Sequence, residues 1–339
     1  MEVSRAPELY ELISRTEFKW ADGLIHLFIG GSAAHGARLG GGGDLDLYGV
    51  YIPPIDKVAG ITEYEMVEGS DQPKAIDPEK YVFQTAKKGE RNNSDDIDVN
   101  FYSLRKWAGM AASGNPTAME FLFTHNFANR APVWEEHIRP NTAAFLSSHA
   151  GLHFQGFCEH MLRTLKGEGT GKRGQRDDLI GEFGYDTKAA MHLLRVLGEG
   201  IELMENGKIT LPRPEKDFLI GVRIGQAGTL ADIEKMAKER LAMLESARLK
   251  SPLPEAVDRK RITEIITAAQ VDVWDHNATS AMKVIAKALN IAVFWIAESC
   301  KLHPVGERKE WEDKDIVRRD ILGLAIEFHK QDEANAAKK

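Results

Sequence analysis

The fold is decided by the segment Phe28-Ile29-Gly30-Gly31-Ser32 and, after eleven further residues, by Asp44-Leu45-Asp46-Leu47. The apolar run before Gly30 predicts a strand that ends in two glycines and a serine. Because Gly31 has no side chain, the backbone there can approach a ligand closely. Its N–H groups and the Ser32 hydroxyl can hold phosphate oxygens, especially if a helix begins at Ala33. The first segment therefore predicts a phosphate-binding turn.

The second segment predicts a strand with two acidic side chains on one face. Asp44 and Asp46 are two residues apart, and side chains on a strand alternate between its faces. Two carboxylates that point the same way are costly unless a cation lies between them, and hard oxygen ligands suit Mg²⁺. Asp98, an acidic residue inside an apolar strand segment, is the candidate for a third ligand. Three converging carboxylates would form a two-metal site.

Each feature alone also has an ordinary structural explanation. A Gly-Ser pair followed by two aspartates arises by chance in turns, and Asp44 alone could simply end the glycine-rich segment Gly40–Gly43. The ordered set of turn, paired acids and a later strand acid is more specific, and it favours a site for nucleotidyl transfer.

The pattern of apolar and turn-forming residues changes near residue 130. Before it, β-rich runs alternate with turns marked by Gly and Pro; after it, apolar residues recur at the three- and four-residue spacing of helices. We therefore expect an α/β region at residues 1–130 and an all-helical domain at residues 131–339, of which 276–339 is a helical extension. Strands are expected at Leu24–Ile29, Leu45–Ile52 and Ile97–Tyr102, and helices at Ala6–Thr16, Leu104–Ser113, Leu152–Leu165, Asp178–Glu205, Thr229–Arg248, Val257–Cys300 and Asp313–Lys330. Lys57–Asp96 and Gly167–Arg176 are expected to be loops.

The composition limits the classes of function. Apolar residues make up 43% of the chain and charged residues 28%, which is ordinary for a globular protein. The formal net charge of −7 argues against a protein that coats long nucleic acid with a broad basic surface. Cys158 and Cys300 lie far apart, so we expect a reducing compartment rather than a disulfide scaffold. No apolar run reaches the roughly 20 residues of a membrane span, and the protein is expected to be cytoplasmic.

Five separated motifs resemble the DNA polymerase beta-like nucleotidyltransferase superfamily, in particular the predicted nucleotidyltransferases associated with RNA ligases. In chain order they are Gly31-Ser32-Ala33-Ala34-His35-Gly36, Asp44-Leu45-Asp46, Asp98 with Tyr102-Ser103-Leu104-Arg105-Lys106-Trp107, Gly114-Asn115-Pro116-Thr117, and Gly184-Tyr185-Asp186-Thr187-Lys188-Ala189-Ala190-Met191-His192. The resemblance implies an α/β (α+β) nucleotidyltransferase palm with a small mixed sheet, followed by the helical domain. Gly40–Gly43 is unusually glycine-rich for this family, and residues 276–339 lie beyond the resemblance.

The resemblance also implies the reaction. A nucleoside monophosphate would pass from an NTP, with ATP among the candidates, to an acceptor hydroxyl with release of pyrophosphate, and Mg²⁺ or Mn²⁺ would be required. Asp44 and Asp46 would bind both ions, and Asp98 would bind the ion on the nucleophile side and help the acceptor lose its proton. An RNA 3′ end, a protein side chain and a small molecule stay open as acceptors: the association with RNA ligases favours RNA, whereas the negative net charge favours the other two.

A rival interpretation is a non-catalytic nucleotide-binding or interaction module, such as one component of a toxin–antitoxin pair. Loss of an acidic residue would favour this interpretation, but Asp44, Asp46 and Asp98 are all present.

A basic face is expected on the helix predicted at Asp178–Glu205. Lys188, His192 and Arg195 are spaced i, i+4 and i+7, so they share one side of that helix. The face could meet the triphosphate, or it could be a solvated surface. Because the resemblance covers Lys188 and His192, we predict a ligand-binding role for these two and a surface position for Arg195.

The Gly167–Arg176 segment resembles a P-loop only at first sight. Three residues rather than four separate Gly167 from Gly171, and Arg173 replaces the Ser or Thr that would bind Mg²⁺. Either a basic loop that contacts phosphate through Lys172, Arg173 and Arg176 or an ordinary surface loop fits this sequence.

Overall fold

The structure is a computed structural model, and it describes residues 6–14, 16, 18–40, 45–60, 64–66, 73–75, 77–86, 96–128, 130–168 and 176–275. The chain divides into two compact units, residues 1–270 and 271–339, and the helices and strands from α1 to α11 belong to the first. The predicted domain boundary near residue 130 falls inside this unit, and the division into 1–130 and 131–339 stays a prediction. The helical extension predicted at 276–339 lies outside the described residues.

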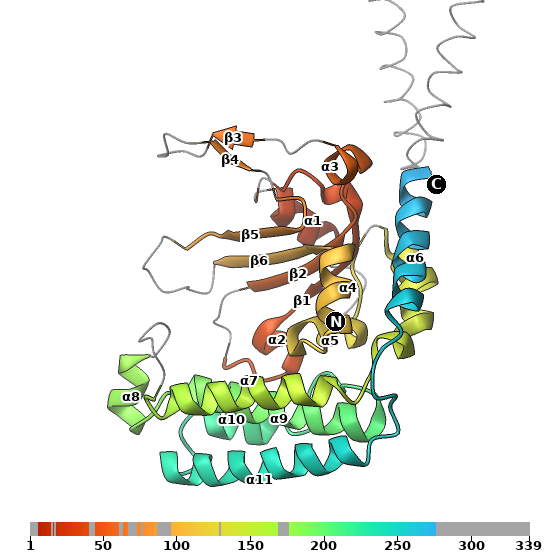
Figure 1. Cartoon of the computed structure of the whole chain (residues 1–339). Coiled ribbons are helices and arrows are strands. Elements are labelled where there is room, and N and C mark those ends of the chain that lie inside the picture. Colours follow the sequence, from red (N-terminus) through yellow and green to blue (C-terminus); the bar gives the residue numbers. More distant parts are fainter. Residues whose placement is uncertain are drawn as a thin grey trace, which may run out of the picture. The chain divides into compact units, whose positions relative to one another are not determined.

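A small mixed sheet forms the strand-containing part of this unit (Figure 1). Its strands, in spatial order, are β1 (Leu24–Ile29), β2 (Leu45–Tyr51), β6 (Ile97–Ser103) and β5 (Lys80–Gln84). β1 pairs with β2 and β5 with β6 in antiparallel fashion, whereas β2 and β6 are parallel. The predicted mixed sheet is confirmed, and β1, β2 and β6 end within one residue of their predicted bounds.

The prediction that Lys57–Asp96 is a loop is wrong. The segment includes part of α3 (Ile55–Ala59), a separate two-stranded sheet of β3 (Tyr64–Met66) and β4 (Pro73–Ala75), and the edge strand β5. Side chains along β5 alternate between exposed and half-buried. This strand therefore lacks the continuous apolar run that identifies the inner strands.

One face of the sheet is covered by α1 (Ala6–Ser14). Leu47 of β2 lies opposite Val99 of β6, and both are fully buried in a cluster that contains Leu9 and Ile13 of the helix. The segment between α1 and β1, which includes η2 (Ala21–Gly23), contributes Phe18 to the same cluster. Burial of each large apolar side chain contributes roughly 1.5–3 kcal/mol, so this face is a principal source of stability.

Short helical segments cover the opposite face and connect the sheet to the helical part. They are α4 (Leu104–Ala112), α5 (Pro116–Glu120), η3 (Phe121–Phe123), α6 (Ala131–Val133), η4 (Trp134–Ile138) and η5 (Arg139–Phe145). The ring of Phe121 lies 4.7 Å from that of Phe28 and 5.9 Å from that of Tyr48, measured between centroids. Because side chains on a strand alternate, Asp46 lies on the same face as Tyr48, and Asp98 lies beside it on β6.

Phe121→Ala should lower the free energy of unfolding by about 3–5 kcal/mol, because the Phe121 ring is fully buried and its removal leaves a cavity. Val82→Ala on the edge strand is the control, since the Val82 side chain is 51% exposed. Urea denaturation followed by circular dichroism measures both variants. Equal losses for the two would show that Phe121 is not a core anchor.

The helical part is built around α9 (Thr187–Asn206), which packs against α7 (Ala150–Leu165), α10 (Lys216–Arg223) and α11 (Leu230–Leu249) (Figure 1). α11 begins with a capping box, in which Thr229 and Asp232 each accept a hydrogen bond from the backbone N–H of the other. In the part of the chain that the structure describes, no helix is long and apolar enough to cross a membrane.

The helix predicted at Asp178–Glu205 is interrupted, and the prediction of one continuous helix is wrong. Residues Asp177–Phe183 form α8, and Gly184 follows with a φ of +81°. Asp186 then caps the first turn of α9, and its carboxylate accepts a hydrogen bond from the Ala189 N–H at 3.0 Å. The left-handed glycine and the Asp cap are a stop and a start signal that apolar spacing alone does not reveal.

Candidate active site

The Gly31 turn and the acidic strand pack directly against each other. α2 (Gly31–His35) begins at Gly31 rather than at Ala33, and Gly31 has a φ of +56°. A Cβ atom placed on Gly31 would lie 1.8 Å from Oδ2 of Asp46, so the carboxylate occupies the space that any side chain would need. The Gly30 N–H also donates to the Asp46 carbonyl at 2.8 Å. Ser32 is half-buried in the first turn of α2.

Asp46 and Asp98 are direct register partners on the parallel strands β2 and β6. Neighbouring strands lie about 4.8 Å apart, and register partners point to the same face, so the two side chains are neighbours. Both are half-buried. Asp44, the third predicted ligand, lies outside the described residues. The structure thus brings together two of the three predicted carboxylates, beside the predicted phosphate-binding turn.

Tyr48 is a neighbour of Asp46 that the sequence analysis missed. Its ring packs on Gly30, where an added Cβ atom would lie 2.3 Å from Cδ2 of the tyrosine. Burial raises the pKa of the Tyr48 phenol, and the negative charges of Asp46 and Glu120 raise it further. Tyr48 therefore stays protonated next to the acidic site. Its position two residues after Asp46 on the same strand was the available signal.

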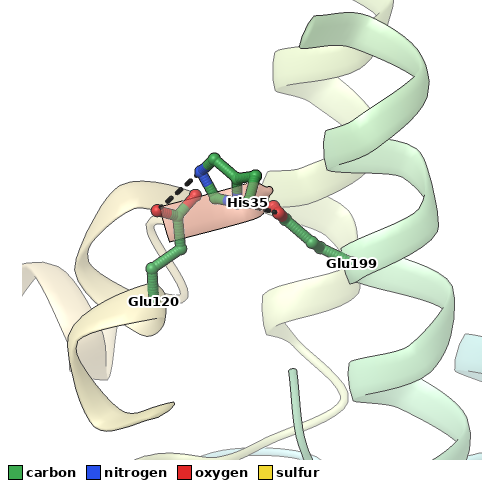
Figure 2. A group of neighbouring side chains, drawn as sticks. All are labelled: His35, Glu120 and Glu199. Carbon is green, nitrogen blue, oxygen red and sulfur yellow. Dashed lines mark ion pairs between the residues drawn. The ribbon is translucent and has the colours of Figure 1, made fainter. Parts of the chain in front are cut away.

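A buried ionic cluster joins α2 to the helical part, and Figure 2 shows three of its members, His35, Glu120 and Glu199. Arg195 of α9 is only 6% exposed, so its predicted surface position is wrong. Its Nη1 atom lies 2.7 Å from Oε1 of Glu120 and 2.7 Å from Oε1 of Glu199. His35, the last residue of α2, lies between the two carboxylates, with ring nitrogens 3.5 Å from Glu120 and 3.4 Å from Glu199. Burial of charged groups requires this pairing, because an uncompensated charge in the interior is strongly destabilising.

His35, Glu120 and Glu199 have the donor types of a metal site, with one ligand atom from each within 4.8 Å of the others. The guanidinium of Arg195 already supplies the positive charge at this position, in contact with both carboxylates. Burial opposes that charge, but the Glu199 and Glu120 carboxylates more than compensate and raise the pKa of Arg195. The cluster is therefore an internal ion-pair network rather than a candidate metal centre.

His192 and Lys188 lie on α9, toward its N-terminus from Arg195. Burial lowers the pKa of His192 to about 3, and the positive charges of Arg195 and Lys188 add to the effect. The His192 ring is therefore neutral at physiological pH. Of the basic loop residues, Arg176 forms an ion pair with Asp186 at 3.1 Å, whereas Lys172 and Arg173 lie outside the described residues.

Comparison with known proteins gives an assignment. The sequence matches the family described as "RlaP: RNA repair pathway DNA polymerase beta family" over residues 1–267. No curated protein sequence matches the chain. A crystal structure of a nucleotidyltransferase-like protein from Exiguobacterium sibiricum is similar with 11% sequence identity, a TM-score of 0.25, and coverage of 73% of this chain and 74% of that one. Because the sequence match spans most of the chain, the protein belongs to the RNA repair pathway DNA polymerase beta family.

Proposed function

We propose that this protein is a metal-dependent nucleotidyltransferase that moves a nucleoside monophosphate from an NTP to an acceptor hydroxyl and releases pyrophosphate. Membership of the polymerase beta family supports nucleotidyl transfer as the class of reaction. The observation that carries the proposal is the convergence of Asp46 and Asp98 as register partners, with the Asp46 carboxylate against Gly31.

The proposed metal ligands are Asp44, Asp46 and Asp98, which offer only the hard carboxylate oxygens that Mg²⁺ and Mn²⁺ favour. When bound, the ions would neutralise charge on the triphosphate and on the attacking oxygen. The acceptor oxygen forms a bond to the α-phosphorus while the bond from that phosphorus to the bridging oxygen breaks in line, and pyrophosphate leaves. Asp98 assists removal of the acceptor proton, and Gly31 and Ser32 bind phosphate oxygens.

Lys188 and His192 are proposed to contact the triphosphate. A lysine ammonium neutralises charge, whereas a neutral imidazole donates a single hydrogen bond without adding charge. The low pKa of His192 supports the second role, because this ring stays neutral over the whole physiological range. The two residues would therefore contribute differently to nucleotide affinity.

The proposed acceptor is the 3′ hydroxyl of an RNA end. The description of the family as part of an RNA repair pathway favours RNA over a protein side chain or a small molecule. A net charge of −7 is compatible with recognition of a single strand end rather than a long duplex. The two widely separated cysteines favour a reducing compartment, and we place the reaction in the cytoplasm.

Pyrophosphate release tests the proposal. We expect release from at least one NTP in the presence of Mg²⁺ or Mn²⁺ and an RNA oligonucleotide with a free 3′ hydroxyl, and none after chelation of the metal. The same oligonucleotide with a 3′-deoxy end is the control, because it lacks only the acceptor group. Nucleotide binding without pyrophosphate release from any NTP, with RNA, protein or small-molecule acceptors, would instead support a non-catalytic binding module.

A further inference from the structure

The Arg195 guanidinium contacts two histidines in addition to the two carboxylates. Its Nη2 atom lies 2.8 Å from Nδ1 of His192, and its Nη1 atom lies 3.3 Å from Nδ1 of His35. An arginine side chain has only donors, so Nδ1 of His192 accepts from Nη2. The two hydrogens of Nη1 go to the Glu120 and Glu199 carboxylates at 2.7 Å, so the longer contact with His35 does not set the tautomer of that ring. One buried side chain therefore makes contact with four groups on three different helices, α2, α5 and α9.

One of these contacts determines where the proton of His192 lies. Burial and the charge of Arg195 lower the pKa of both His35 and His192, so each ring is neutral and carries one proton. Because Nδ1 of His192 accepts from Arg195, the proton of this ring is on Nε2. In His35, Nε2 lies 3.5 Å from Oε2 of Glu120 and Nδ1 lies 3.4 Å from Oε1 of Glu199, so each nitrogen faces a carboxylate. In His192, the tautomer makes Nε2–H a neutral donor that does not contact the arginine.

The same network fixes the C-terminal end of α2, the helix that begins at the Gly31 turn. The His35 carbonyl accepts from the Arg213 N–H at 3.1 Å, and a Cβ atom on Gly36 would lie 2.9 Å from Pro212. Glu120 is the last residue of α5, a helix that starts with the cap Asn115 and with Pro116. The five residues of α2 are thus held at their C-terminal end by the helical part of the chain, with Arg195 at the centre.

From this arrangement we infer that Arg195 is a positioning residue of the active site: it sets the Nε2–H tautomer of His192 and, through its contacts with His35 and Glu120, holds α2 against α9. It acts on the nucleotide only through these neighbours, and for that effect the inference rests on the proposed function. His192 then presents a neutral N–H donor to a phosphate oxygen, and the Gly31 turn keeps a fixed position relative to α9.

Arg195→Lys is the variant that tests this role. A lysine retains the positive charge beside Glu120 and Glu199, but its single nitrogen has three hydrogens and cannot contact four groups on three helices. Arg240→Lys is the matched control. Arg240 is an arginine of α11 whose Nη1 atom donates to the Leu194 carbonyl at 2.9 Å, so the same change is made in the same helical part without disturbing the two histidines.

The first measurement is the tautomer of His192, read from ¹⁵N–¹H correlation spectra of protein labelled in its histidine rings and assigned with a His192→Gln variant. We expect the parent to show a protonated Nε2 and an unprotonated Nδ1. In Arg195→Lys we expect ring nitrogen chemical shifts that are averaged between the two neutral tautomers of His192. The second measurement is the affinity for Mg²⁺-NTP, which should fall about tenfold in Arg195→Lys, with KM rising by the same factor and kcat changing less. Arg240→Lys should match the parent in both.

Several results would overturn the inference. One is an Nδ1–H tautomer of His192 in the parent; another is a folded Arg195→Lys protein with parental nitrogen shifts and parental affinity. Equal losses of NTP affinity in Arg240→Lys would assign the effect to general packing. If Arg195→Lys does not fold, the double variant Arg195→Met/Glu199→Met removes both buried polar partners together and is expected to fold, with the same shifts and affinity loss. A parent that neither binds nor converts any NTP would refute the proposed function, while the nitrogen shifts would still decide whether Arg195 positions His192.

Discussion

Asp46→Asn is expected to lower the rate of pyrophosphate release by about a thousandfold or more and to leave the fold intact. Asparagine keeps the size of the side chain and most of its hydrogen bonding, but it removes a charge that two cations would share. The empty protein should be slightly more stable in the variant, because the neighbouring carboxylates of Asp46 and Asp98 repel each other without a cation. Mg²⁺-NTP should raise the melting temperature of the parent and not that of the variant.

Asp56→Asn is the matched control, because Asp56 is an exposed residue of α3 that pairs with Lys57 at 3.2 Å. It should retain the parental rate and the parental response to Mg²⁺-NTP. In a non-catalytic module, Asp46→Asn would change little except the binding of a partner. An Asp46→Asn protein that releases pyrophosphate as fast as the parent would refute the metal-dependent mechanism.

Gly31→Val is expected to abolish measurable NTP binding, whereas Ser32→Ala should weaken it less than about tenfold. The valine meets two obstacles: a φ of +56° that β-branched residues rarely adopt, and a Cβ position 1.8 Å from the Asp46 carboxylate. The turn and the acidic residue would both have to move. Removal of the Ser32 hydroxyl leaves the backbone donors of the turn in place. Calorimetric titration with Mg²⁺-NTP measures both variants.

Gly40→Val separates the two obstacles. Gly40 has nearly the same φ, +57°, but among the residues that the structure describes none lies within 4 Å of an added Cβ atom. A valine there suffers the backbone strain alone, and we expect its NTP affinity to stay near the parental value. Equal affinities for the parent, Gly31→Val and Ser32→Ala would show that the turn is not part of the nucleotide site.

The inner strands of the sheet could be predicted from the sequence because their signal is local. β1, β2 and β6 are apolar runs with Gly, Pro or charged residues at their ends, and the alternation rule placed Asp46 and Asp98 on defined faces. β5 could not be predicted in this way, because its outward residues are exposed and its stability comes from pairing with β6, which follows only after a long connection.

The ionic cluster could not be predicted, because its partners are distant in the sequence. Helical spacing correctly groups Lys188, His192 and Arg195 on one side of α9, but it does not say what that side meets. The two contacts that bury Arg195 come from Glu120, 75 residues earlier, and from His35, 160 residues earlier. In the folded protein, residues of α2 and α5 pack against this side of α9, and Arg195 becomes part of a buried ion-pair network.

The contact between His35 and Arg195 also sets an order of events during synthesis of the protein. Ribosomes add about 5–20 residues per second, so the 160 residues between these side chains take on the order of ten to thirty seconds to make. Asp46 and the last strand of the sheet, β6, are synthesised within that interval, and until it ends α2 has no guanidinium to hold it. A nascent chain would therefore contain the Gly31 turn and both register-paired aspartates before the contacts that fix α2, which form only when α9 has emerged and docked.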